Sequence, residues 1–145
     1  MAKTPLNIGD NMVAKKIKTR QEEKSAAKDF LKKAEDNYTQ MVAALDAGNY
    51  NAVGTLAVQC AISSADAACV YEKGIRSISD DHFDVCDLVS SVPIPDAKEK
   101  ANVLKRIVGK KNLIQYERRN IYLSEAEDLA KLTSRFYHWV RSHVK

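Results

Sequence analysis

The stretch that decides the fold is residues 50–77, YNAVGTLAVQCAISSADAACVYEKGIRS, in a chain of 145 residues. From about Asn51 to Lys73 apolar and small side chains occupy almost every turn, with no continuous polar face. A helix of this kind is expected at the centre of a protein, covered on all sides. Its alanines and serines let neighbouring helices approach closely, and Asp66 needs a polar partner if it is buried. Gly74 is predicted to end the helix.

Further helices are predicted on both sides of this segment. Apolar residues recur at three- and four-residue steps over 27–45, and Gly48 then suits a left-handed cap. After the central helix, a short helix is predicted with Ser79 as its N-cap. A fourth apolar stripe runs over 97–114, and Gly109 interrupts it, which favours a kink or a close helix contact.

The closing helix is marked by Ser124 and Glu127, whose spacing is that of a capping box. No segment shows the alternating pattern of a β-strand. We therefore predict one all-α domain over residues 19–145, an antiparallel up-and-down bundle of four to five helices, preceded by a flexible basic arm over residues 1–18.

The composition is that of an ordinary globular protein, with 45% hydrophobic and 29% charged residues. We expect no membrane association, because no apolar run approaches the roughly eighteen residues of a membrane span. The N-terminus also lacks the apolar stretch of a secretory signal, so the expected location is the cytoplasm. The three cysteines have no metal-ligand spacing and are predicted to be buried thiols. No cofactor or metal is predicted.

The net charge of +4 is unevenly placed along the chain. Residues 98–119 carry eight basic side chains and two acidic ones, whereas residues 80–87 carry four aspartates and no lysine or arginine. A basic stripe binds phosphates by releasing counterions, but it is also typical of a solvated helix face, and both interpretations stay open. The residues predicted to bind RNA are Lys105, Arg106, Lys110, Lys111, Asn112, Tyr116, Arg118 and Arg119.

Three patterns in this order resemble the HEPN superfamily over roughly residues 25–144. The first is the quoted stretch, with A-I-x-x-A-D-A at 61–67 and then a glycine and an Arg-Ser pair. The others are DDHFDVCDLV at 80–89, and KKNLIQYERR at 110–119 followed by SEAEDLAKLTSRFYHWV. The resemblance implies a helical bundle working as a homodimer. Many such proteins are metal-independent ribonucleases, and many are toxins paired with a nucleotidyltransferase or another antitoxin.

The usual motif of that family is an arginine, a polar residue, and a histidine four to six positions further on. Histidine moves protons, and arginine stabilises charge that develops on phosphate. Where the motif is expected, in the penultimate long helix, this chain has Lys111, Asn112 and Tyr116, so the usual pair is absent there. A literal string of this form runs instead from Arg76 to His82, between the second and third helices.

Two interpretations of Arg76 and His82 stay open. In the first they are catalytic, and Asp80 and Asp81 raise the pKa of His82 toward neutrality and orient its ring. In the second they are structural: Arg76 pairs with one of these aspartates or with a helix end, and His82 caps or packs at the helix start.

Three functions are consistent with the sequence. The first is a toxin-like or RNA-processing protein that binds RNA and cleaves it without a metal ion. The second is a non-catalytic module that pairs with a nucleotidyltransferase or another partner protein. The third is a scaffold that binds a nucleotide or small ligand between helices, although the chain has no phosphate-binding loop to support it.

Overall fold

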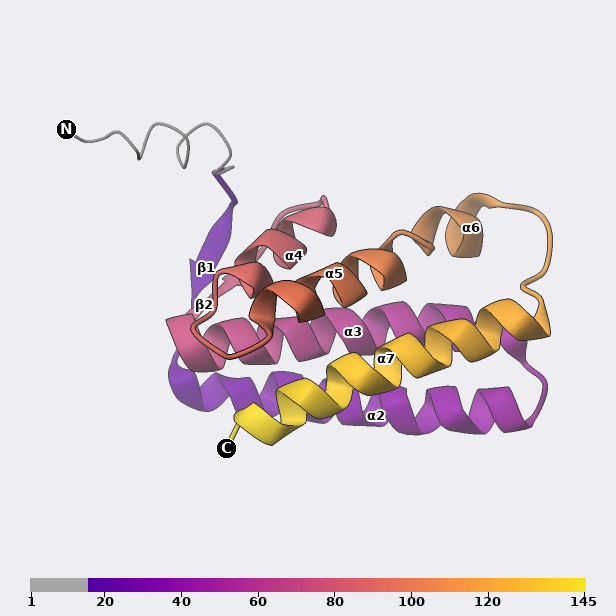
Figure 1. Cartoon of the computed structure of the whole chain (residues 1–145), viewed down its shortest axis with the longest axis horizontal. Coiled ribbons are helices and arrows are strands. Elements are labelled where there is room, and N and C mark those ends of the chain that lie inside the picture. The colour runs from indigo at the N-terminus through magenta and orange to yellow at the C-terminus, as the bar shows by residue number, and fades with distance from the viewer. Residues whose placement is uncertain (1–15) are drawn as a thin grey trace.

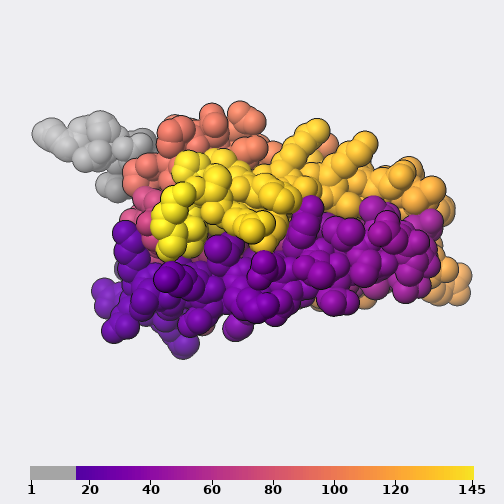
Figure 2. All heavy atoms as spheres, turned by 90° about the horizontal axis from the view of Figure 1, so that it is seen from below, coloured from indigo at the N-terminus to yellow at the C-terminus, as the bar shows by residue number. Residues whose placement is uncertain are grey.

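The computed structural model describes residues 16–145. The apolar helix α3 (Tyr50–Lys73) lies at its centre, and more than half of its residues are buried. Helices α2 (Ala27–Asp46) and α7 (Leu123–His143) pack along it and against each other (Figure 1). Seen from the side of α2, the side chains of α2 and α7 fill the surface and hide most of α3 (Figure 2). The predicted central helix and all-α bundle are confirmed.

Three shorter helices cover the remaining side of α3. They are α4 (Phe83–Ser90), α5 (Ala97–Val108) and α6 (Lys111–Tyr116), and each contacts α3. Figure 1 shows α4 beside α5, with α6 continuing beyond the end of α5. The predicted fourth helix is therefore two helices, because α5 ends at Val108 and Gly109 follows as its C-cap. A Cβ at Gly109 would lie 3.0 Å from the carbonyl oxygen of Lys105.

A two-stranded antiparallel sheet joins the start of the described chain to the end of α3. Strand β1 (Thr19–Gln21) pairs with β2 (Ile75–Ser77), and the Ile78 N–H donates to the Lys18 carbonyl at 2.9 Å. A short 3-10 helix, η1 (Lys24–Ala26), leads from β1 into α2. The expectation of no strand was wrong, because strands of three residues are too short to show an alternating pattern. Residues 1–15 of the predicted arm lie outside the described residues.

The two predicted glycine caps are found at the helix ends, whereas the predicted serine cap is not. Gly48 (φ 79°) and Gly74 (φ 66°) adopt the left-handed conformation after α2 and α3, as predicted. Ser79 is not an N-cap, since α4 begins at Phe83. The Ser79 hydroxyl instead accepts the Asp81 N–H at 3.1 Å and donates to Asp84 at 2.6 Å, so it shapes the loop before the helix.

The start of α7 also differs from the prediction. The helix begins at Leu123, one residue before the predicted cap Ser124. The carboxylate of Glu125, not that of Glu127, accepts the backbone N–H of Tyr122 at 2.9 Å. The predicted capping box was therefore displaced by two residues, because an acid lies at both candidate positions and the sequence does not separate them.

By length and mean hydropathy alone, α3 would suffice to cross a membrane, contrary to the sequence-based expectation. In this fold, 72% of its most apolar window is buried under neighbouring elements. The core helix of a globular bundle passes the same test, so the finding is weak evidence for a membrane span.

Candidate active site

A pocket of about 340 Å³ lies between α3, β2 and the start of α4. Its wall contains Arg76, which lies on β2, and His82, which directly precedes α4. The fold therefore brings the two residues of the predicted pair to one pocket. The residues that line it are Ile62, Asp66, Arg76, Ser77, Ile78, Ser79, Asp81, His82 and Val85. The geometry thus permits joint action by Arg76 and His82, and their catalytic role stays a prediction.

The guanidinium of Arg76 is held in place on two sides. Its Nε donates to the Glu22 carboxylate at 2.9 Å, and both side chains are mostly buried. Its central carbon lies 5.3 Å from the centroid of the Phe30 ring. The expected pairing with Asp80, Asp81 or a helix end was wrong, because the β1–β2 pairing brings Glu22 beside β2.

This arrangement leaves part of the Arg76 side chain available to a ligand. Among residues 16–145, the bond to Glu22 is the only hydrogen bond that its guanidinium makes. Its two terminal nitrogens can therefore donate to an anion that enters the pocket.

The ring of His82 is partly buried, and its Nδ1 has no hydrogen-bond partner among the described residues. Burial lowers the pKa of His82, the positive charge of Lys111 lowers it further, and only Asp81 opposes them. The expectation that Asp80 and Asp81 raise this pKa was wrong, because burial and a cation from α6 outweigh the neighbouring acid. His82 is consequently neutral at pH 7 and able to accept a proton.

Asp66 on α3 is a further ionisable group of this pocket, and it is only 8% exposed. Burial raises the pKa of its carboxyl to about 7, although the charges of Arg76 and Lys33 oppose this effect. The nearby carboxylate of Glu22 raises the pKa a little more. The sequence singled out Asp66 as a polar residue in an apolar helix, but it did not place this residue with Arg76 and His82.

Most of the residues predicted to bind RNA lie on the surface formed by α5, α6 and the following loop. Lys111 on α6 is partly buried beside His82, and its positive charge lowers the pKa of that residue in the pocket. Tyr116 is 75% exposed at the end of α6. The exposed members of the set are Lys105, Arg106, Lys110, Asn112, Tyr116, Arg118 and Arg119.

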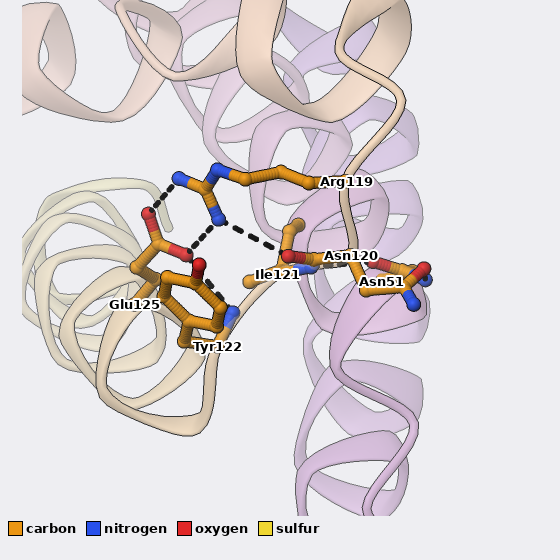
Figure 3. Close-up of polar contacts among 6 residues, drawn as sticks. All are labelled: Asn51, Arg119, Asn120, Ile121, Tyr122 and Glu125. Atoms are coloured by element: carbon orange, nitrogen blue, oxygen red, sulfur yellow. Dashed lines mark hydrogen bonds and ion pairs between the residues drawn. The ribbon is translucent and has the colours of Figure 1, made fainter.

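Arg119 differs from the other cations because its charge is already paired (Figure 3). Its terminal nitrogens donate to both carboxylate oxygens of Glu125, at 2.9 and 2.8 Å, and its guanidinium lies 4.6 Å from the Tyr122 ring centroid. The same loop is tied to α3, since the Asn51 side chain accepts the Ile121 N–H at 2.9 Å. Arg119 therefore holds the loop before α7. Because its terminal nitrogens already donate to Glu125, they are less available to bind a phosphate.

No group of three metal-binding side chains occurs among residues 16–145. The predicted burial of the cysteines is confirmed, and burial raises the pKa of each thiol to about 12. Thiols of this kind are protonated at neutral pH, so they are poor nucleophiles and poor ligands.

Together, the central helix and its flanking helices form an all-α bundle. A solved structure described as an archaeal HEPN homologue has the same fold, with a TM-score of 0.59 and 20% sequence identity. The match covers 82% of this chain and 98% of the other. No protein-family model matches the chain, and no curated protein does either. The predicted HEPN-like fold is confirmed by this likeness.

Proposed function

We propose that this chain is an HEPN-like RNA-processing protein that binds RNA and cleaves it without a metal ion. The observation that carries the proposal is the shared pocket of Arg76 and His82, which come from different elements of the fold. The proposal includes a homodimer acting as a toxin or in RNA processing, because the HEPN resemblance implies such a setting, and a cytoplasmic location, which the sequence predicts.

The proposed reaction uses groups whose charge states suit it. Neutral His82 takes the proton of the ribose 2′-hydroxyl, and the 2′-oxygen attacks the adjacent phosphorus. The terminal nitrogens of Arg76 stabilise the charge that develops on the phosphate oxygens. Lys111 lies close enough to lower the pKa of His82, so it also adds positive charge where the phosphate would lie. The products are a 2′,3′-cyclic phosphate and a 5′-hydroxyl.

RNA would reach this pocket along the basic surface of α5 and α6. Lys105, Arg106 and Lys110 are exposed there and form no ion pair with any described residue. Unpaired surface cations of this kind bind phosphates and release counterions, so binding should weaken steeply with salt.

The first test is incubation of the purified protein with a mixed RNA pool in EDTA. Arg76→Ala and His82→Ala are compared with Arg135→Ala and His138→Ala, which remove the same side chains from the exposed surface of α7. We expect cleavage by the parent and both α7 variants, and a loss of roughly 100-fold or more in the two pocket variants. Intact RNA from the folded parent would overturn the ribonuclease proposal.

The second test concerns RNA binding and uses the salt dependence of the dissociation constant. Replacing Lys105 and Arg106 by alanine should lower the slope of log affinity against log salt by about 1.4, since each phosphate contact to a single strand contributes about 0.7. The matched control replaces Lys28 on α2 and Arg135 on α7, which are also exposed and form no ion pair with any described residue. An equal slope for the α5 variant and the parent would exclude the basic surface as the binding site.

A second candidate function is a non-catalytic module that pairs with a nucleotidyltransferase or other antitoxin. One observation favours it: two large apolar side chains near the pocket, Ile78 and Phe83, are 42% and 47% exposed. Phe83 is the first residue of α4. A stable complex with a partner, without any cleavage of RNA, would favour this candidate.

A further inference from the structure

The pocket of Arg76 and His82 contains a carboxyl group to which the proposed function assigns no role. Asp66 lies on α3, where its chain neighbours Ala65 and Ala67 are fully buried. Burying a carboxyl in such surroundings is unfavourable unless it is paired or protonated. Asp66 accepts no hydrogen bond from the described residues, and it lines the pocket, so the pocket is where its carboxyl meets solvent or a ligand.

Charged groups face Asp66 from several elements. Arg76 on β2 and Lys33 on α2 favour its ionised form, whereas Glu22 before η1 opposes it. Burial outweighs them all, and the pKa of about 7 leaves a substantial protonated fraction at neutral pH. In the same pocket, burial and the charge of Lys111 from α6 lower the pKa of His82, and Asp81 opposes them.

At neutral pH one pocket thus holds a carboxyl with a substantial protonated fraction and an imidazole that is mostly neutral. The pKa of Asp66 is raised and that of His82 is lowered. A general acid and a general base that work together need shifts in these directions. The structure adds a geometric reason, because Asp66 is buried and lines the same pocket as His82.

We propose that Asp66 is the general acid of this pocket, protonating the 5′-oxygen that leaves when the RNA backbone is cut. This inference rests on the proposed ribonuclease function. His82 removes the 2′-hydroxyl proton, the 2′-oxygen forms a bond to phosphorus, and the bond from phosphorus to the 5′-oxygen breaks. The leaving oxygen takes the proton of Asp66, which becomes a carboxylate, while His82 becomes an imidazolium. Exchange of one proton with solvent at each group restores the starting state.

The test compares two substrates with Asp66→Asn, which keeps the size of the side chain but cannot donate an acidic proton. One substrate is an ordinary RNA, and the other has sulfur in place of the 5′-bridging oxygen at a single cleavable linkage. A thiolate leaves without protonation, so the second substrate does not need a general acid. We expect the variant to lose roughly 100-fold or more on the ordinary RNA and to match the parent on the sulfur-containing linkage.

The matched control is Asp46→Asn, which removes an exposed carboxylate at the end of α2 and should behave as the parent on both substrates. The pH profile adds a second readout. Cleavage of ordinary RNA by the parent should fall above about pH 7 as Asp66 loses its proton, and this alkaline decline should be absent in Asp66→Asn.

The outcomes separate this inference from the function on which it rests. If Asp66→Asn cleaves ordinary RNA at the parent's rate, the proposed ribonuclease function is supported and the general-acid role of Asp66 is overturned. An equal loss on both substrates would show that Asp66 acts only on structure, which also overturns the inference. No cleavage of either substrate by the folded parent would overturn both the proposed function and the general acid.

Discussion

Replacing Asp66 by asparagine should change the stability of the fold by an amount that depends on pH. The pKa of this carboxyl is 3.8 in a solvated chain and about 7 in the fold. The folded protein therefore binds the proton more tightly than the unfolded chain does, and ionisation of Asp66 lowers the unfolding free energy. The penalty begins as pH rises above about 4 and becomes constant above about 7.

The magnitude follows from the two pKa values. At about 1.4 kcal/mol for each unit of pKa, the full penalty is about 4 kcal/mol. Asp66 is only 8% exposed, so solvent screens little of it. At pH 5 the unfolded chain is already ionised and roughly 2 kcal/mol of the penalty is present, whereas at pH 8 nearly all of it is present. Asp66→Asn should therefore gain roughly 2–3 kcal/mol relative to the parent between pH 5 and pH 8.

Urea unfolding at these two pH values measures this quantity. The comparison is the unfolding free energy of Asp66→Asn minus that of the parent at each pH, with Asp46→Asn as the control for a solvated carboxylate. Using differences cancels the titration of every other group that the proteins share. A difference between variant and parent that is the same at pH 5 and pH 8 would refute the raised pKa, and with it the charge state assigned to Asp66 in the pocket.

Three further predictions concern other parts of the fold. Arg119 and the Tyr122 N–H lower the pKa of Glu125 to about 2, so the parent should lose stability as pH falls from about 4.5 toward 2, and Glu125→Gln should not show this loss in acid denaturation. Asn51→Ala removes the acceptor of the Ile121 N–H, and urea unfolding should show a loss of about 1–3 kcal/mol, with no loss contradicting the assigned bond. The three buried thiols should react with a thiol reagent only as fast as the protein opens, and rapid labelling of the native protein would contradict their burial.

The central part of the fold could be predicted from sequence because one physical signal dominates it. A helix that is apolar on every side has to be covered, and α3 is covered by α2 and α7 on one side and by shorter helices on the other. Gly48 and Gly74 also acted as predicted, because a positive φ is costly for any residue with a Cβ. These inferences needed only local sequence.

The candidate site was less predictable because its contacts join distant parts of the chain. Arg76 pairs with Glu22, which lies 54 positions away, and this pair depends on strands too short to recognise. The acids nearest to His82 in sequence suggested a raised pKa, yet burial and Lys111 on another helix lower it. Asp66 was recognised as unusual within its helix, but only the fold shows which pocket it lines.

The pocket differs physically from the rest of the core that surrounds it. The α3 residues near Asp66 are small and apolar, and an apolar side chain in its place would avoid the cost of burying a carboxyl. The same pocket contains an imidazole whose Nδ1 lacks a partner among the described residues, and a guanidinium held so that its terminal nitrogens remain available. Features that weaken a fold locally are expected at functional sites, where a ligand or reacting group satisfies them. Their meeting at a single pocket is therefore the strongest physical reason to look there for the chemistry of this protein.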